Sequence, residues 1–251
     1  MTEVWRVHIP GDWAQNMRDL LYAREFAIKQ RVMTVNRVKA IFRREGKTAP
    51  SLKGLSGWEG IEESLPKYSE EFAFCRQLRD ICVSRELDLT RKIKEELAKH
   101  SQHKLVLSVP NMGPLTAAVL LACIEDISRF KSSRTLCAYF GIVPGIFQSG
   151  ATERMGPITK RGNSLARKFL AQAAHHSRYV SSPFNPVYRD ILKNKNTSIA
   201  VMTVARKIVT CVYAVMRHNE PFDPVKMGLV KIDKEVKFVR AYERARNLQA
   251  V

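Results

Sequence analysis

The stretch from residue 13 to residue 44, WAQNMRDLLYAREFAIKQRVMTVNRVKAIFRR, decides the fold class of this chain. Apolar residues recur in it every seven positions, at Ala14, Leu21, Ile28, Val35 and Phe42. Residues at this spacing lie along one side of an α-helix and form a seam that needs a partner. The sequence therefore predicts one long helix, with Asp12 as its N-cap and Gly46 as its stop.

A second long helix is predicted from Ser69 to His100. Its apolar seam has a similar spacing, at Phe72, Cys75, Cys82, Leu89 and Ile93. A turn-rich link, GKTAPSLKGLSG at 46–57, separates the two helices. Two long helices joined by a link favour an antiparallel coiled-coil hairpin, while pairing with a second chain would cover the same seams. The sequence leaves both arrangements open.

The segment LVLSVPNMGPLTAAVLLACI at 105–124 has an apolar lead, a Pro-x-x-Gly-Pro turn and an apolar helix. This pattern is typical of a helix-hairpin-helix element. In such an element Gly113 lets the backbone approach a phosphate, and Pro114 takes the first helical position. The same pattern also fits a turn that serves core packing alone.

The segment PGIFQSGATERMGPITKRG at 144–162 is rich in glycine and shows little periodicity, which predicts a long functional loop. Further helices are predicted at 131–141, 163–179, 186–195, 198–217 and 234–248. Since no alternating strand pattern is found, the predicted fold class is all-α. Residues 1–103 would form the coiled-coil hairpin, and residues 104–251 would form a helical DNA-binding domain.

The charge of the chain indicates a polyanionic partner. The net charge is +18 over 251 residues, with a pI of about 10.0. From Arg129 to Arg217 there are fifteen basic and two acidic residues, a net of +13, whereas residues 1–104 carry twenty basic and fifteen acidic ones, a net of +5. A solvated surface usually mixes both signs. The one-sided stretch therefore favours a nucleic-acid surface.

The five cysteines are odd in number, lie among apolar residues and lack the spacing of a metal site. They predict reduced core residues of a cytoplasmic protein. No signal-peptide pattern opens the sequence, and the longest apolar run, at 115–124, is about half as long as a membrane span. We therefore expect a soluble chain with no membrane partner.

Residues 105–219 resemble the C-terminal transposase domain of the insertion-sequence 110/116/902 family, through five motifs that follow in the same order. These motifs are VPNMGPLTAAVLLACIEDISRF, LCAYFGIVPG, FQSG, TKRGNSLARKFLAQAA and VMTVARKIVTCVYAVMRHNEPFD. The stretch VHIPGDWAQNMRDLLYAREFAIKQR resembles the segment that follows the family's first domain. Together these resemblances cover about four-fifths of the chain.

The resemblance implies a DNA transposase, a recombinase in which Ser149 of the FQSG motif is the nucleophile that attacks a DNA phosphate. Four basic residues would neutralise the charge of the attacked phosphate: Arg154, Lys160, Arg161 and Arg167. Gly162 and Asn163 stand with Lys160 and Arg161 at a helix start, where free backbone amides favour phosphate. Asn163 fits a purely structural N-cap role equally well.

Full-length members of the family resemble a two-part enzyme whose N-terminal RuvC-like domain holds magnesium with Asp and Glu residues. No segment of this sequence resembles that domain. We therefore expect no cofactor in this chain, with Mg²⁺ implied only for the RuvC-like domain, and a truncated chain that is inactive alone. The alternatives are a non-enzymatic DNA- or RNA-binding remnant or regulator, and a coiled-coil interaction protein with incidental charge.

The expected partners are DNA, an element-encoded guide RNA, and either a second copy or a partner transposase chain bound through the coiled coil. The guide RNA is implied by the family resemblance alone.

Overall fold

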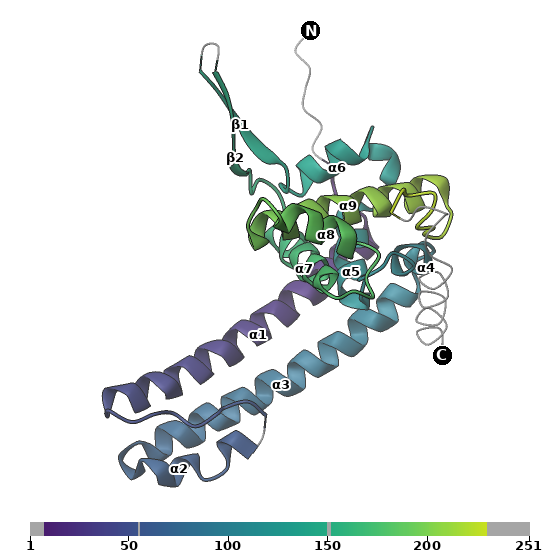
Figure 1. Ribbon diagram of the computed structural model, residues 1–251. Helices are drawn as coiled ribbons and strands as arrows, with labels where there is room; N and C mark the ends of the chain where they lie inside the picture. The colour runs from purple at the N-terminus through teal and green to yellow at the C-terminus, as the bar shows by residue number, and fades with distance from the viewer. Residues whose placement is uncertain (1–7, 55, 150–151, 230–251) are drawn as a thin grey trace. The chain divides into compact units, whose positions relative to one another are not determined.

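The computed structural model describes residues 8–54, 56–149 and 152–229, and this part of the chain is predominantly helical (Figure 1). The predicted helical class is confirmed. Two compact units make up the chain, residues 16–95 and residues 1–15 together with 96–251. A domain boundary at residue 103 stays a prediction, and the helix expected at 234–248 lies outside the described residues.

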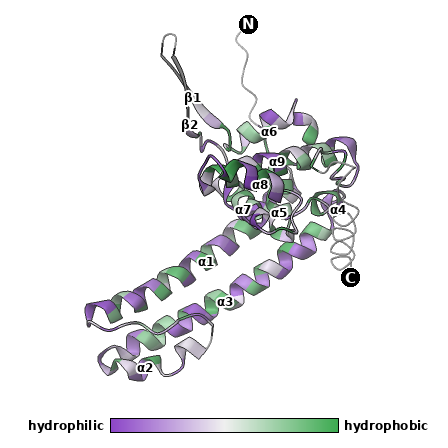
Figure 2. Ribbon diagram, in the orientation of Figure 1, coloured by the Kyte–Doolittle hydropathy of each residue, from purple (hydrophilic) through white to green (hydrophobic). Residues whose placement is uncertain are grey.

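Two long helices supply most of the 16–95 unit: α1, Asp12–Arg44, and α3, Ser69–Ala98. Hydrophilic and hydrophobic residues alternate along both of them (Figure 2). Arg24 Nη2 lies 3.1 Å from Glu86 Oε1, and Arg37 Nε lies 2.9 Å from Glu71 Oε1. Since an early residue of α1 pairs with a late residue of α3 and the reverse, the helices run antiparallel.

Backbone hydrogen bonds define both ends of α1. The Gln15 N–H donates to the Gly11 carbonyl over 2.9 Å, so Gly11 is the N-cap, and the prediction for Asp12 was one residue too late. Asp12 lies in the first turn, where its charge favours the helix dipole. At the other end Gly46 has a φ of +68°, and the Lys47 N–H donates to the Phe42 carbonyl over 2.9 Å. The predicted stop at Gly46 is confirmed as a Schellman motif.

The link between α1 and α3 packs over an apolar cluster. It contains three short helices: η1 at Ser56–Trp58, α2 at Ile61–Ser64 and η2 at Pro66–Tyr68. Trp58 is 1% exposed there, and the rings of Phe42 and Phe72 stack with their centroids 5.5 Å apart. This cluster fixes the link onto both long helices.

The second unit is built on two apolar helices: α5, Pro114–Ile124, and α9, Thr197–His218. Every residue of α5 from Thr116 onward is buried. The other helices of the unit are α4 at His103–Leu107, α6 at Ser133–Tyr139, α7 at Ser164–His175 and α8 at Asn185–Leu192. All four contact α9, and α4 and α7 also contact α5.

By length and composition α9 is also the one described helix that could cross a membrane, a test that buried core helices pass as well. Ten of its residues are buried in the core of this unit. That packing accounts for its apolar character.

All five cysteines are free and buried, as predicted for core residues. Burial raises the pKa of the Cys137 thiol to about 11 and that of Cys211 to about 12. A thiol with so high a pKa stays protonated at neutral pH and is a poor nucleophile. These two residues therefore contribute packing.

The prediction of a long loop at 144–162 was wrong over most of its length. Residues Pro144–Ser149 and Thr152–Ile158 form two antiparallel strands, β1 and β2, with Phe147 opposite Arg154 and Ser149 opposite Thr152. The register shifts between Pro144 and Ile146. Hydrogen bonds between the two strands pair the backbone N–H and C=O groups whatever the side chains are. A hairpin therefore forms here although apolar and polar residues do not alternate along the sequence.

Candidate nucleic-acid interface

Close backbone contacts hold the base of the β-hairpin. The Thr159 N–H donates to the Val143 carbonyl over 2.9 Å, and the Lys160 N–H donates to the Gly141 carbonyl over 3.1 Å. A Cβ atom on Gly141 would lie 1.9 Å from the Arg161 carbonyl oxygen, and one on Gly162 would lie 2.1 Å from the Tyr139 carbonyl oxygen.

Both glycines also have a positive φ, +67° at Gly141 and +101° at Gly162. Both positions therefore require glycine. Gly162 is predicted from the sequence to have a role toward DNA, and the structure shows that its small size serves this loop contact. A role toward DNA stays a prediction.

The start of α7 is capped by Asn163. Its side-chain oxygen accepts hydrogen bonds from the backbone N–H groups of Leu165, over 2.9 Å, and Ala166, over 3.1 Å. The N-cap role predicted for Asn163 is confirmed. Arg167 Nη1 donates to the carbonyl oxygens of Gly162, over 3.0 Å, and Phe140, over 3.3 Å. The Arg167 guanidinium thus ties α7 to the hairpin base, and its binding to a phosphate stays a prediction.

Lys160 and Arg161 are exposed and come just before this N-cap. Lys160 has a left-handed backbone, with a φ of +54°, where the chain turns from β2 toward α7. The free amides and dipole of a helix start attract anions. The structure therefore brings two cations and a helix N-terminus to one exposed corner.

Ser149 and Arg154 belong to the outer part of the hairpin, and the side chains of residues 146–155 lie outside the part that the structure describes. Figure 1 shows β1 and β2 extending away from the helices of their unit. Five strand steps separate Pro144 from Ser149, which corresponds to about 17 Å. Lys160 follows the opposite, inner end. One phosphate therefore cannot contact both Ser149 and Lys160.

Gly113 lies directly before α5, with Pro114 at the first helical position as predicted. Its φ of −86° is ordinary, and a Cβ atom there would meet nothing within 4 Å. Asn111, with a φ of +64°, fixes this turn, because its Nδ2 donates to the hydroxyls of Ser177 and Ser182 over 3.0 Å each.

Ser177 and Ser182 follow the C-terminal end of α7, whereas Lys160 and Arg161 precede its N-terminus. A helix of 12 residues is about 18 Å long. Gly113 and the cations thus form two separate candidate contacts. Asn111 was not predicted from the sequence, although asparagine is enriched among the non-glycine residues that adopt a positive φ.

The end of α7 carries a further surface that the sequence analysis missed. Tyr179 is 50% exposed and Val180 is 72% exposed. Arg178 Nη2 donates to the Tyr179 hydroxyl over 2.7 Å, and its guanidinium lies 4.9 Å from the centre of that ring. An exposed aromatic residue beside an arginine is suited to stacking on a base. Among the described residues, no three His, Cys, Asp or Glu side chains are placed to hold a metal ion.

Residues 103–189 match the model of the transposase IS116/IS110/IS902 family. This part of the chain is similar to that family. The resemblance predicted from the five motifs is confirmed, and every candidate residue described above, from Gly113 to Val180, lies within the matched range.

Curated relatives extend the similarity to more of the chain. The transposase for insertion sequence element IS1111A of Coxiella burnetii is 25% identical over 224 residues, which cover 83% of this chain and 60% of the relative. The transposase for insertion sequence element IS1328 of Yersinia enterocolitica is 23% identical, over 83% of this chain and 65% of the relative. The pilin gene-inverting protein of Moraxella bovis is 31% identical over 125 residues, 47% of this chain and 38% of that relative. This chain thus spans about three-fifths of the first two relatives.

Proposed function

We propose that this chain binds DNA and takes part in DNA transposition as a serine-dependent recombinase. The family match over residues 103–189 is the main support, since it includes the FQSG motif and the start of α7. The relatives' names, transposase and gene-inverting protein, fit DNA as the substrate. The exposed cations Lys160 and Arg161 at a helix start give this substrate a place to bind.

In the proposed reaction, the Ser149 hydroxyl oxygen attacks a phosphorus atom of the DNA backbone. A bond forms between this oxygen and phosphorus, the bond from phosphorus to the oxygen of the neighbouring nucleotide breaks, and that oxygen leaves with a proton. The resulting phosphoserine keeps the energy of the cleaved bond until a hydroxyl of a second strand displaces Ser149.

The attacking hydroxyl has to lose its proton, which needs a base or a metal ion. The acidic, Mg²⁺-binding groups implied by the family resemblance would supply this activation. Within the chain, Arg154 is the candidate cation closest to Ser149 along the hairpin, because it pairs with Phe147, two residues before the serine. We propose Arg154 as the group that stabilises the charge on the attacked phosphate.

Lys160, Arg161 and the positive end of the α7 helix dipole would bind a different phosphate of the same DNA. The length of the hairpin, about 17 Å, corresponds to several nucleotides along one strand. This second contact would position the DNA without reading its sequence. Gly113 at the far end of α7 would provide a third backbone contact.

Association of two chains through α1 and α3 is a further part of the proposal. The large apolar side chains Phe26, Phe74 and Ile81 are 64%, 62% and 66% exposed on these helices. Phe74 and Ile81 are seven residues apart and so lie on one face of α3, and an exposed apolar face of a helix marks a protein contact. Light scattering of the chain at several concentrations tests this point, and a monomer at every concentration contradicts it. A structured RNA is a second candidate ligand of the basic surface.

Replacing Ser149 tests the chemistry. We expect a full-length family member that carries the acidic domain, with this chain's residues 103–189 grafted in, to form a covalent adduct with end-labelled DNA on a denaturing gel. Ser149→Ala should abolish the adduct and leave DNA binding unchanged, because the nucleophilic oxygen alone is lost. An adduct that persists, or that maps by peptide sequencing to Ser164, would show that another residue is the nucleophile.

Replacing Lys160 and Arg161 together tests the binding surface. We expect Lys160→Ala/Arg161→Ala to weaken binding to all duplex sequences, and to make the slope of log affinity against log salt shallower by about 2, since each lost phosphate contact removes about 0.9. Fluorescence anisotropy at several salt concentrations gives the slope. Lys29→Ala/Lys94→Ala removes the same charge from exposed positions on α1 and α3 and serves as the control.

A further inference from the structure

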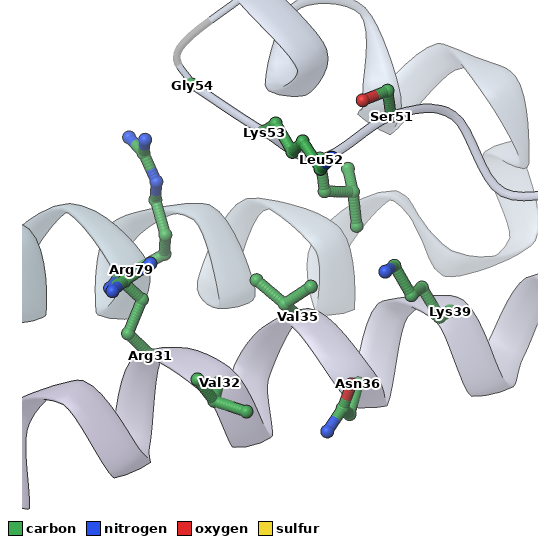
Figure 3. Close-up of a pocket in the computed structure, with 10 residues that line it drawn as sticks. All are labelled: Arg31, Val32, Val35, Asn36, Lys39, Ser51, Leu52, Lys53, Gly54 and Arg79. Atoms are coloured by element: carbon green, nitrogen blue, oxygen red, sulfur yellow. The ribbon is translucent and has the colours of Figure 1, made fainter. Parts of the chain in front are cut away.

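The 16–95 unit contains a pocket of about 470 Å³ formed by α1, α3 and the link (Figure 3). Its volume is roughly that of fifteen water molecules in the liquid, which is enough for a phosphate group with its attached sugar. Six polar side chains line it: Arg31, Asn36, Lys39, Ser51, Lys53 and Arg79. The apolar lining consists of Val32, Val35 and Leu52.

The charge of this lining is one-sided. Four of the lining side chains are cations, and none of the described lining residues carries a carboxylate. Two arginines have acidic neighbours outside the pocket: Arg31 Nη2 lies 3.2 Å from Glu86 Oε2, and Arg79 Nη1 lies 2.5 Å from Asp80 Oδ1. Like charges gathered at a half-enclosed site repel each other, and a bound anion removes this repulsion.

The fold places these cations together. Arg31, Val35 and Lys39 are spaced by four residues, so they lie along one face of α1, and Figure 3 shows Val35 between the other two. Arg79 reaches the same pocket from α3, although its side chain is only 9% exposed. A buried arginine side chain usually has a partner for its charge, and Arg79 has Asp80 as this partner while it also lines the pocket.

Close packing of the link against its neighbours positions Lys53 at the pocket. Leu52 is 7% exposed and belongs to the apolar cluster of Trp58, so Ser51 and Lys53 are held on either side of an anchored residue. A Cβ atom on Gly57 would lie 1.9 Å from the Ser51 carbonyl oxygen, so the link passes this point only because residue 57 is glycine.

One donor at the pocket has no acceptor. The Nε atom of Arg31 is buried and, within the part of the chain that the structure describes, has no hydrogen-bond partner. A buried donor without a partner costs about 1–3 kcal/mol. An acceptor oxygen supplied by a ligand would remove this cost.

We propose that this pocket binds a backbone phosphate of duplex DNA, as a site separate from Lys160 and Arg161. A phosphodiester has one negative charge and several acceptor oxygens, which suit the forked donors of Arg31 and Arg79, the charges of the two lysines and the neutral donors Ser51 and Asn36. The apolar lining suits the attached sugar. This inference rests on the proposed function in one respect, that DNA is the partner.

Removing the two exposed lysines of the pocket tests the proposal in the full chain. We expect Lys39→Ala/Lys53→Ala to weaken binding to a 20-base-pair DNA at least about tenfold near 0.1 M salt, and to make the salt slope shallower by about 2. The control Lys29→Ala/Lys94→Ala lowers the net charge equally and should leave both values nearly unchanged. Circular dichroism checks that the helical content of each variant is that of the unaltered chain.

Ser51→Asp provides a second variant, which leaves all four cations in place. Its carboxylate would occupy the position of the phosphate and weaken DNA binding without removing a positive charge. If neither this variant nor Lys39→Ala/Lys53→Ala differs from the control, the pocket does not bind DNA.

The same titrations distinguish this proposal from the proposed function. If Lys160→Ala/Arg161→Ala weakens binding and the pocket variants do not, the pocket does not bind DNA and the proposed site at Lys160 and Arg161 is supported. If only the pocket variants weaken binding, the proposal that Lys160 and Arg161 bind DNA is wrong. A chain that binds no DNA overturns both. A loss confined to an RNA duplex of the same sequence also overturns the pocket as a DNA site.

Discussion

At the scale of single residues, two glycines decide where the cations before α7 lie. Gly141 and Gly162 bring the loops at 139–143 and 159–162 into backbone contact. Arg167 adds two hydrogen bonds to the same corner. Lys160 and Arg161 are thus carried by a backbone that is fixed on both sides, although their side chains are exposed. A fixed backbone favours phosphate binding, because less conformational entropy is lost when the phosphate binds.

Replacement of Gly162 by alanine tests this arrangement. Gly162→Ala places a Cβ atom 2.1 Å from the Tyr139 carbonyl oxygen at a φ of +101°. We expect the free energy of unfolding to fall by about 1–3 kcal/mol from backbone strain, and DNA affinity to fall with it. Urea denaturation followed by circular dichroism measures the first effect, and anisotropy measures the second.

Gly113→Ala is the matched control, since its φ is −86° and a Cβ atom there has open space. Its free energy of unfolding should stay the same or rise by about 0.4–1 kcal/mol, because alanine restricts the unfolded chain. A loss of stability at Gly113 as large as that at Gly162 would contradict the steric explanation.

At the scale of elements, the two hairpins of this chain are stabilised in different ways. The helices α1 and α3 bury an apolar seam and share ion pairs, with Arg24 and Arg31 both bound to Glu86. Their stability comes from tertiary packing, as for most helices. The strands β1 and β2 instead extend from the helices of their unit and pair only with each other. A two-stranded hairpin of this kind is marginally stable by itself.

Two neighbouring phenylalanines test the packing of α3. Phe72 is fully buried and stacks on Phe42, whereas Phe74 is 62% exposed on the same helix. We expect Phe72→Ala to lower the free energy of unfolding by about 3–5 kcal/mol, since it removes a large side chain from a packed cluster. Phe74→Ala should change it by less than about 0.5 kcal/mol. Equal effects in urea denaturation would show that α3 is not oriented as described.

At the scale of the whole molecule, net charge and its distribution decide what the chain binds. The net charge of +18 includes +13 between Arg129 and Arg217, the stretch that contains Lys160 and Arg161. The 16–95 unit holds more balanced charge, and four of its cations line one pocket. Each unit therefore carries one of the two proposed sites for a polyanion.

The total number of phosphate contacts follows from the salt dependence of the unaltered chain. We expect log affinity for duplex DNA to fall steeply and linearly with log salt, because bound phosphates release condensed counterions. Two sites of at least two contacts each predict a slope of about −4 or steeper. A flat slope in anisotropy titrations would contradict DNA binding through the basic surfaces and favour an interaction protein with incidental charge.

The sequence by itself determined the long helices, the stop at Gly46, the N-cap at Asn163, the buried cysteines and the resemblance to the transposase family. Each of these depends on periodicity, on a hydrogen bond within a few residues, or on an ordered set of motifs. Residues that are close together in the sequence therefore determine each of them. For the same reason the start of α1 was placed within one residue of Gly11.

Only the tertiary structure decided the β-hairpin, the anchoring of Asn111 to Ser177 and Ser182, and the cation pocket. It also separated Ser149 from Lys160, which the sequence analysis had assigned to one phosphate. These features depend on contacts between residues far apart in the chain, or on whether a glycine-rich segment pairs with itself. Spacing along a sequence does not specify such contacts, because their free energy arises only when distant backbones and side chains pack together.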